Sequence, residues 1–504
     1  MKQIFLINAQ IVLILTLISA SQLTLAANEI DNLQPGHWYE VPNSKLNQLC
    51  PEDNAQGHGY AWSAYCAGII NAWSGGAYDT KRDRLLVWGG GHGDYAGNEV
   101  YGFDVDTLSW QQITQPSDLS DGCDGFGWYG ECPGGETMPD GKPIARHTYD
   151  GVEYIPELDK LWAAGGSRWP GGQLSDATWT LDLANTTWVR KKDTPEKSWY
   201  YTIFSAYDAV TKNVFSFGQD SLLMHNPVTD QWTELTSGDS FFSDSMTAEI
   251  DPERRKMVVI GDGLAYYYDL SDLQNVTRKD LVTTGDNSIL NAKAPSLVYD
   301  SKSKTMIAWS GEPDKDLQPQ DVYELDLDSF QWTKRSPAAT NTVIPSKSNS
   351  QGTYGRFRYI PSKNAFIVVN AVDENVYFYK LPLATVVAPD ADTSDLNPVV
   401  PADVDDSTHV MQEDAEDQNT DAWEVYTNKL SGEVSNIVDP DNSTNRVIQL
   451  QGSGTDTGFR YTFATPDSDN TSIEWKMKYS EAYTVYISVQ TTLGHRYLYY
   501  TSVD

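Results

Sequence analysis

The chain of 504 residues lacks the short motifs that mark several large enzyme classes. It has no Gly-x-Ser-x-Gly elbow, no P-loop, and no Gly-x-Gly-x-x-Gly fingerprint placed between a strand and a helix. These absences argue against an α/β-hydrolase and against a nucleotide-binding α/β enzyme. Cysteine is scarce, with 4 residues, and neither a Cys-x-x-Cys pair nor a His-rich segment is present, so a cysteine-based metal centre is not indicated.

Basic residues are also scarce, because 36 Lys and Arg face 70 Asp and Glu, which gives a formal net charge of −34. This charge argues against nucleic acid or an anionic membrane surface as a partner. An anionic substrate would need a local cluster of Arg, Lys or His to overcome the long-range repulsion. Hydrophobic residues make up 40% of the chain, and aromatics are plentiful, with 16 Trp and 29 Tyr. A packed core is therefore expected, and global disorder is excluded.

Long apolar runs are missing except at the N-terminus. Lys2 precedes an apolar stretch with its core at residues 11–18, and the segment that follows ends in the small residues Ala26 and Ala27. This layout is typical of a secretory signal peptide over residues 1–27, and the apolar core is short for a retained membrane anchor. We therefore expect a secreted, periplasmic or cell-surface protein that has no membrane partner.

The four cysteines can form disulfides in an exported chain, because such compartments are oxidising. Pairing by proximity joins Cys50 to Cys66 and Cys123 to Cys132. Three connectivities exist for four cysteines, and the spacing alone does not choose among them.

An internal repeat sets the expected architecture. Its first copy runs from Tyr78 through a polar turn to Gly89, at the end of an apolar strand. The same step of eleven residues occurs six times, and each copy predicts two strands joined by a turn. A third strand follows, and in four copies an acid or amide lies six positions before a Trp that starts an outer strand. The other copies run from Tyr154 to Gly165, Tyr207 to Gly218, Ile250 to Gly261, Tyr299 to Ser310 and Tyr359 to Asn370, and the outer-strand residues are Trp110, Trp188, Trp232 and Trp332.

This pattern resembles the kelch repeat, whose four-stranded sheets stack radially as the blades of a β-propeller. The glycine pairs at 89–90 and 165–166 and the spaced Trp residues carry the resemblance, while the later copies lack the double glycine. Residues 36–41 form a Trp-bearing strand without a hairpin of its own, so we expect this strand to complete blade six and close the ring. The sequence thus predicts an all-β, six-bladed kelch-type β-propeller over residues 36–381.

The composition changes after the last blade. Residues 382–420 contain Pro and many Asp with little periodicity, as expected of a solvated acidic linker. Strand-like alternation then resumes, and residues 421–504 resemble the jelly-roll β-sandwich modules appended to secreted carbohydrate-active proteins. Because the chain stops at Asp504 directly after a predicted strand, we expect this sandwich to be incomplete.

The repeat register predicts where functional side chains gather. In kelch topology, the loops that enter the innermost strands and the loops that follow the second strands open on one face. His92 and Arg168 lie three positions after the marker glycines of blades one and two, whereas His147 and Tyr200 lie seven positions before the marker tyrosines of blades two and three. The predicted patch comprises His92, His147, Tyr200 and Tyr201 as catalytic candidates and Arg146, Arg168 and Arg356 as substrate-binding candidates.

A cationic and aromatic patch of this kind suits β-elimination in uronic-acid polysaccharides. An Arg or His neutralises the uronate carboxylate, a Tyr or His abstracts the neighbouring proton, and an acid protonates the leaving oxygen. The patch resembles the sites of secreted propeller lyases such as the ulvan lyases, which have seven blades rather than six. The resemblance implies a polysaccharide lyase, with a polysaccharide or another glycan as partner and no cofactor.

Each candidate also has a purely structural interpretation. His92 can order a Gly-rich turn, His147 can be a hydrogen-bonded structural histidine, and Arg168 can pair with an acid such as Asp176. Tyrosines at blade entrances are commonly packing residues. The prediction therefore depends on the convergence of several residues.

Other functions stay open. A six-bladed kelch sialic-acid mutarotase matches the blade count, whereas a kelch-type copper radical oxidase needs an unpaired Cys beside a Tyr, which the expected disulfides do not leave. A non-catalytic glycan-binding or surface-interaction propeller would use the same face, since fold alone does not define an enzyme. Acidic loops at 121–124 and 314–316 leave room for structural calcium, although their spacing matches no EF-hand loop. The oligomeric state is not encoded in a readable pattern.

Overall fold

A computed structural model describes residues 29–53, 60–119, 135–195, 203–218, 220–238 and 243–382, and the backbone of six strands between residues 424 and 501. Contacts divide the chain into two compact units, residues 1–384 and 385–504. The predicted signal peptide, Cys123, Cys132, Tyr200 and Tyr201 lie outside the described residues, as does nearly all of the predicted linker. No helix in the described part of the chain is long and apolar enough to cross a membrane.

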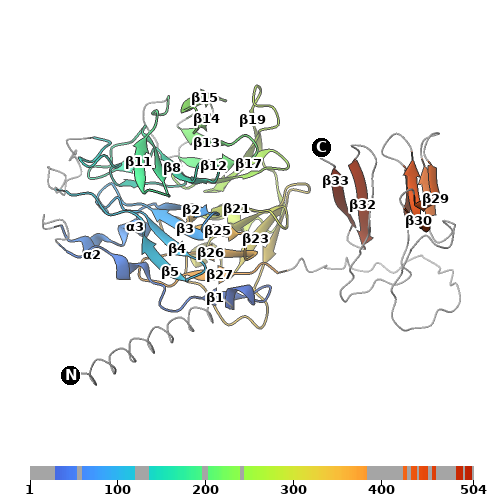
Figure 1. The fold of residues 1–504 in the computed structure, drawn as a ribbon. Coiled ribbons are helices and arrows are strands. Elements are labelled where there is room, and N and C mark those ends of the chain that lie inside the picture. Colours follow the sequence, from blue (N-terminus) through green and yellow to red (C-terminus); the bar gives the residue numbers. More distant parts are fainter. Residues whose placement is uncertain are drawn as a thin grey trace, which may run out of the picture. The chain divides into compact units, whose positions relative to one another are not determined.

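The first unit is an all-β, six-bladed β-propeller (Figure 1). Its innermost strands contact one another in chain order, and the last contacts the first, so the ring is closed. Blades one to three comprise β2 (Gly75–Asp79), β3 (Arg84–Trp88), β4 (Tyr101–Asp104) and β5 (Ser109–Gln112); β7 (Val152–Ile155), β8 (Lys160–Ala164), β10 (Thr178–Asp182) and β11 (Thr187–Arg190); and β12 (Phe204–Asp208), β13 (Asn213–Gly218), β14 (Ser221–Asn226) and β15 (Gln231–Glu234).

Blades four to six have the same antiparallel order from the inner strand outwards, with one added strand in blade five. They comprise β16 (Thr247–Asp251), β17 (Lys256–Gly261), β18 (Leu264–Asp269) and β19 (Thr277–Asp280); β21 (Ser296–Asp300), β22 (Thr305–Trp309), β23 (Val322–Asp326) and β24 (Gln331–Arg335), with β20 (Thr284–Gly285) parallel to β24; and β25 (Phe357–Ile360), β26 (Ala365–Val368), β27 (Tyr377–Tyr379) and β1 (Trp38–Glu40).

The hairpin turn explains the period of the repeat. The residue five positions after each marker has a positive φ, a conformation in which Asn and Asp are enriched among non-glycine residues. This residue reverses the chain between the innermost and second strands, so a fixed spacing places the turn in the same position in every blade. The six residues are Asp83, Asp159, Lys212, Arg255, Lys304 and Asn364.

The N-terminal strand closes the ring, which confirms the six-bladed prediction. β1 pairs antiparallel with β27, with Trp38 opposite Tyr379. The two rings lie 4.7 Å apart, and Trp38 Nε1 donates to the carbonyl oxygen of Gln320 at 2.9 Å. Strand pairing across this junction leaves blade six without an unpaired outer edge at β27.

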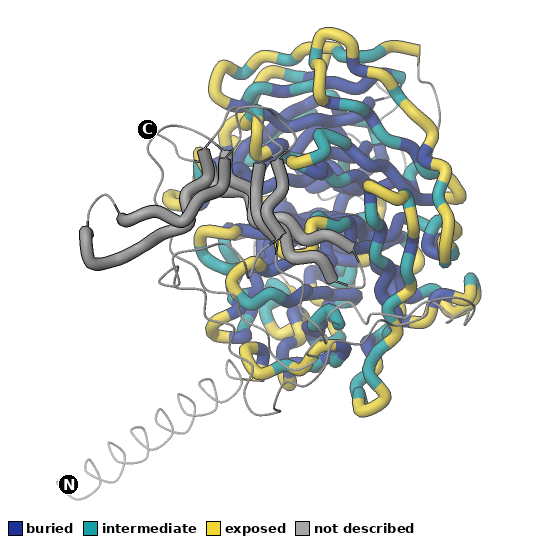
Figure 2. Tube along the Cα trace, turned by 90° about the vertical axis from the view of Figure 1, so that its right-hand side faces the viewer, coloured by how far each residue is buried: buried dark blue, intermediate teal, exposed yellow. Residues whose placement is uncertain are grey.

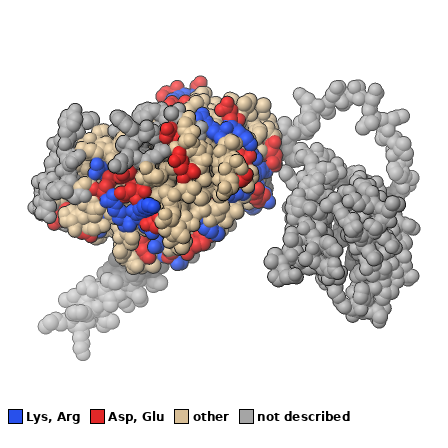
Figure 3. All heavy atoms as spheres, turned by 90° about the horizontal axis from the view of Figure 1, so that it is seen from above, with Lys and Arg blue, Asp and Glu red and all other residues tan. Residues whose placement is uncertain are grey.

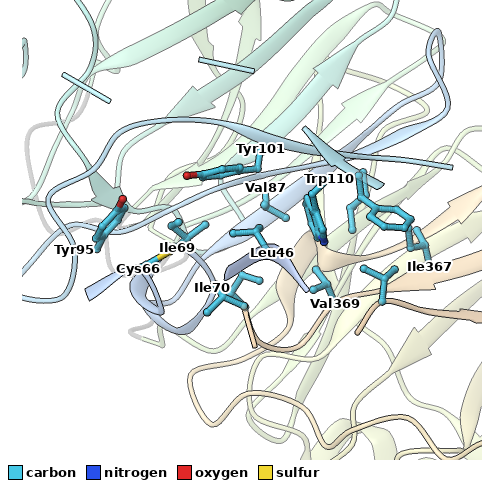
Figure 4. Close-up of a cluster of buried hydrophobic side chains, with 14 of the residues drawn as sticks. Leu46, Cys66, Ile69, Ile70, Val87, Tyr95, Tyr101, Trp110, Ile367 and Val369 are labelled. Atoms are coloured by element: carbon cyan, nitrogen blue, oxygen red, sulfur yellow. The ribbon is translucent and has the colours of Figure 1, made fainter. Parts of the chain in front are cut away.

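An insertion between β1 and β2 supports the blade-one loop. It comprises η1 (Leu46–Leu49), α2 (Trp62–Tyr65) and α3 (Gly68–Asn71), and the predicted disulfide Cys50–Cys66 joins the residue after η1 to the residue after α2. Leu46, Ile69 and Ile70 are buried in one core with side chains of blades one and six (Figure 4). A Cβ added at Gly68 would lie 2.6 Å from the Cβ of Tyr95, so glycine lets α3 approach the loop.

Buried residues follow the inner strands of the propeller, and exposed residues follow its turns and much of its outer strands (Figure 2).

The described backbone of the second unit comprises three antiparallel strand pairs, and their assembly into a jelly roll stays a prediction. The pairs are β28 (Glu424–Thr427) with β31 (Thr457–Arg460), β29 (Glu433–Asp439) with β30 (Asn442–Gln451), and β32 (Thr484–Thr491) with β33 (Gly494–Thr501).

Candidate functional site

A two-stranded ribbon on the loops of blade two carries three of the predicted residues. β6 (Arg146–His147) pairs with β9 (Ser167–Arg168), which places Arg146 opposite Arg168. The glycine loop of blade one packs directly on this ribbon, because a Cβ added at Gly91 would lie 2.3 Å from the Cα of Arg146. Only glycine permits this approach, and the following residue, His92, is thereby brought to the ribbon.

His92 and His147 lie together, as the register predicts. Their ring centroids are 5.4 Å apart. His147 Nε2 lies 2.8 Å from Asp94 Oδ2, and because a carboxylate only accepts, this nitrogen carries the hydrogen. Nδ1 of His147 makes no hydrogen bond to any residue that the structure describes. The Asp94 carboxylate therefore fixes Nε2 of the imidazole, while Nδ1 is available to interact with a ligand.

Burial sets the charge of His147, whose side chain is only 2% exposed. Burial lowers the pKa of His147 below its ordinary value of 6.5, and the Asp94 carboxylate opposes that shift. The imidazole is therefore neutral at neutral pH, which leaves a lone pair on Nδ1. His92, in contrast, is partly exposed.

Aromatic side chains surround the imidazole pair. The Trp73 ring stacks on His147 with centroids 4.9 Å apart and an interplanar angle of 25°. Tyr149 packs edge-on against His147 at 5.9 Å, and Tyr354 packs against Tyr149 at 6.2 Å. Tyr354 Oη donates to the carbonyl oxygen of Asp244 at 2.5 Å. The site therefore joins residues of blades one, two, four and six.

Four of these bulky residues have left-handed backbone conformations. Trp73, His92, Tyr149 and Tyr354 have φ values of 46–47°, whereas most other non-glycine residues with positive φ close the turns of the repeat. The conformation costs about 1–2 kcal/mol for each L-residue, and such strain clusters at functional sites. Its concentration around two imidazoles marks this region as the candidate site.

The arginines form a separate group beside the imidazoles. Arg146 Nη2 lies 3.2 Å and Arg168 Nε 3.1 Å from the two oxygens of Glu136, and Ser175 donates to Glu136 at 2.9 Å. The Arg168 contact is an ion pair only, because its N–H does not align with the oxygen. On the side of the propeller seen in Figure 3, Lys and Arg likewise lie beside Asp and Glu.

The two arginines differ in what they leave available. Arg146 is 1% exposed, and Nη1 also donates to Gly165 and Ser175, so its guanidinium is structurally occupied. Arg168 keeps 16% exposure, and its terminal nitrogens make no hydrogen bond among the described residues. Arg168 is therefore the cation that a ligand can reach.

Arg356 lies apart from this group and is fully buried. Its three guanidinium nitrogens donate to backbone carbonyl oxygens of Ser74, Val369 and Gly352. These bonds join the loop that enters β25 to the loop that enters β2. The structure thus shows Arg356 holding blade six to blade one, with no nitrogen directed to the imidazole pair.

The sequence missed the residues that complete the site. The repeat register predicts no role for Asp94, and it does not point to Trp73, Tyr149, Tyr354 or Glu136. The eleven-residue spacing gives no signal for them, although Asp94 and Tyr149 each lie two positions after a selected histidine. Within the described ranges, no group of three His, Cys, Asp or Glu residues could hold a metal ion.

Comparison with models of known protein families finds no match, and no curated protein sequence matches the chain. The fold and the site define the class as a six-bladed β-propeller with a neutral, carboxylate-held histidine among strained aromatic residues. An activity must therefore be argued from the geometry of this site.

Proposed function

We propose that the protein is a secreted kelch-type propeller that cleaves uronic-acid polysaccharides by β-elimination, with His147 as the proton acceptor. The observation that carries this proposal is the state of the His147 imidazole. Its Nε2 is held by Asp94 at 2.8 Å, while Nδ1 has no hydrogen-bond partner among the described residues. A general base needs this combination of fixed orientation and available lone pair.

The proton transfer follows from this arrangement. His147 Nδ1 would take the proton from the carbon next to the uronate carboxylate, and the electron pair of that C–H bond would form the new carbon–carbon double bond. The glycosidic carbon–oxygen bond breaks, and the leaving oxygen takes a proton from an acid. Asp94 acts as a positioning residue that stabilises the imidazolium formed in the step.

The substrate carboxylate needs a cation to neutralise it, and the leaving oxygen needs a proton donor. Arg168 supplies the accessible guanidinium. The ring of the partly exposed His92 lies 5.4 Å from the ring of His147. We assign His92 one of two roles: it donates the proton to the leaving oxygen, or it binds the substrate carboxylate. Tyr200 and Tyr201 stay predicted alternatives for the donor, and Arg146 supports the site through Glu136.

The test is an ultraviolet assay for unsaturated sugars on sulfated and unsulfated uronic-acid polysaccharides. His147→Gln should abolish the absorbance increase, because the amide cannot accept the proton, and His92→Gln should reduce it by at least tenfold. The matched control is His37→Gln, since His37 lies beside the closing strand and contacts Thr340. Equal rates in the His147 and His37 variants would refute the assignment.

A non-catalytic glycan-binding propeller is the second candidate. Two observations favour it: Glu136 offsets the charge of both arginines, and His147 has only 2% exposure. Retention of the protein by a polysaccharide in an affinity gel, without an absorbance increase on any polymer, would replace the lyase proposal by this one.

A further inference from the structure

We propose that the Cys50–Cys66 disulfide activates the candidate site, so that the proposed lyase works only after these two cysteines are oxidised. This inference concerns the regulation of that site and rests on the proposed function for the activity that is regulated. The disulfide anchors residues 60–71, here called the lobe, which include α2 and α3 and contact the loops of blades one and two.

Tyr60 joins the lobe to both of these loops. This residue lies between the two cysteines in the sequence and is 4% exposed. Its Oη accepts the N–H of Ala96, in the blade-one loop, at 3.0 Å. Its ring packs edge-on against Trp169, with centroids 5.9 Å apart, and Trp169 directly follows Arg168. One side chain of the disulfide-closed segment thus contacts the loops of two blades.

Tyr95 extends this support to His92 and Asp94. The ring of Trp62, in the lobe, packs edge-on against Tyr95 with centroids 6.0 Å apart. The N–H of Gly91 donates to the carbonyl oxygen of Tyr95 at 2.7 Å, and the N–H of Asp94 donates to the carbonyl oxygen of Gly91 at 2.9 Å. The turn that carries His92 and Asp94 is therefore closed on a residue that packs on the lobe.

The disulfide is the covalent anchor of the lobe. Cys66 follows α2, is 1% exposed, and belongs to the same buried core as Tyr95 (Figure 4). Its bond to Cys50 spans a sequence separation of 16 residues. Without the bond, this loop gains conformational entropy that the contacts of Tyr60 must offset. The blade sheets consist of strands outside the lobe, so the site loops lose order before the propeller unfolds.

Export supplies the oxidising step. The signal peptide predicted for residues 1–27 would deliver the chain to a compartment in which disulfides form. There the two thiols lose two protons and two electrons as the S–S bond forms, while a donor disulfide takes them up and becomes two thiols. The chain would thus be inactive during synthesis and active after export.

The test follows activation of the mature protein on oxidation. In a Cys123→Ala/Cys132→Ala background, Cys50 and Cys66 are the cysteines that remain. This protein is isolated with dithiothreitol and then oxidised with glutathione disulfide, and alkylation with mass spectrometry counts the free thiols. Oxidation should raise kcat in the ultraviolet assay by about tenfold or more, because small displacements of catalytic groups are costly. The cysteine-free protein, with Cys50→Ala/Cys66→Ala added, should stay at the lower rate.

Histidine ring signals in NMR spectra report on the site without substrate. The signals of His92 and His147 should shift between the reduced and the oxidised protein. The signals of His37 and His225 should not shift, because His37 contacts Thr340 beside the closing strand and His225 is buried in blade three. These four residues therefore separate loss of order in the site loops from unfolding of the propeller.

Tyr60→Phe tests the connection while the disulfide is intact. The variant keeps the ring but removes the oxygen that accepts the N–H of Ala96, so kcat should fall by about threefold or more. Tyr78→Phe is the matched control, because the Tyr78 hydroxyl donates to Asp83 at 3.2 Å in the hairpin turn at the other end of β2. Equal kcat values for the two variants would overturn the role of Tyr60.

Activation on oxidation, with shifts confined to His92 and His147, would support the inference. Equal rates and equal spectra of the reduced and oxidised forms would overturn it. Shifts in all four histidines would also overturn it, because the bond would then stabilise the whole propeller. Shifts confined to His92 and His147, with no elimination by the oxidised protein, would keep the disulfide control of the site and reject the lyase.

Discussion

Replacing Glu249 by Gln should flatten the pH dependence of the propeller's stability between about pH 4.5 and about pH 7. Glu249 lies on the innermost strand β16, and its Oε2 is 3.4 Å from Arg358 Nη1. Asp150 and Glu153 are buried near the same guanidinium. Three buried carboxyl groups thus lie near one guanidinium. Because one positive charge cannot balance three negative charges, protonation of these carboxyl groups is favoured.

The direction and the size of this stability change follow from the pKa of Glu249 in the folded chain. Burial raises the pKa of Glu249 from 4.5 to about 7, and Arg358 offsets part of the shift. The folded chain therefore binds this proton more tightly than the unfolded chain, so the stabilisation is complete below about pH 4.5 and is lost as the pH rises towards 7. The difference corresponds to at most about 3 kcal/mol, because the side chain retains some exposure.

Urea unfolding of the mature protein between pH 4.5 and 7.5, followed by near-ultraviolet circular dichroism, measures this effect. Across this interval, the free energy of unfolding of the wild type should fall by up to about 3 kcal/mol more than that of Glu249→Gln. Glu253→Gln is the control, since Glu253 is half-exposed and pairs with Lys304 on the surface. Parallel pH profiles for the wild type and Glu249→Gln would refute the reasoning.

Four further predictions concern the site and its support. Activity should fall as the pH drops through the pKa of His147, which burial holds below 6.5, and a pH–rate profile locates that limb. Asp94→Asn should lower kcat by at least tenfold with unchanged thermal stability, because Asp94 is 45% exposed. Gly172→Ala would place a Cβ 2.5 Å from the His92 ring, so kcat should fall; because Gly172 has a φ of 77°, the free energy of unfolding should also decrease by about 1–2 kcal/mol. Arg356→Met would leave buried carbonyl groups unpaired, and unfolding should show a loss of about 3 kcal/mol or more.

The architecture could be predicted because the repeat encodes local geometry. A fixed distance between the marker residue and the positive-φ turn residue defines each hairpin. The sixth copy has no outer strand of its own, and the N-terminal strand that contains Trp38 fills that place. Blade four shows what the pattern omits. Its outer strand β19 has no Trp, and the Arg278 guanidinium lies 4.1 Å from the Tyr266 ring instead.

The site could be predicted in part, because register fixes the height of a residue but not the direction of its side chain. His92 and His147 meet as predicted, since two adjacent loops place them there. Arg146 and His147 are neighbours on one strand and therefore point to opposite sides, which separates the arginine from the imidazoles. Arg168 pairs with Glu136 and not with the suggested Asp176, a long-range contact that spacing does not encode.

The most direct test of the account is cleavage in water enriched in oxygen-18, followed by mass spectrometry of the products. Elimination breaks the glycosidic bond without adding solvent oxygen, so we expect unsaturated products that contain no heavy oxygen. The reaction should be absent from His147→Gln and unchanged in His37→Gln. Incorporation of heavy oxygen, or full activity of the His147 variant, would contradict the proposed chemistry.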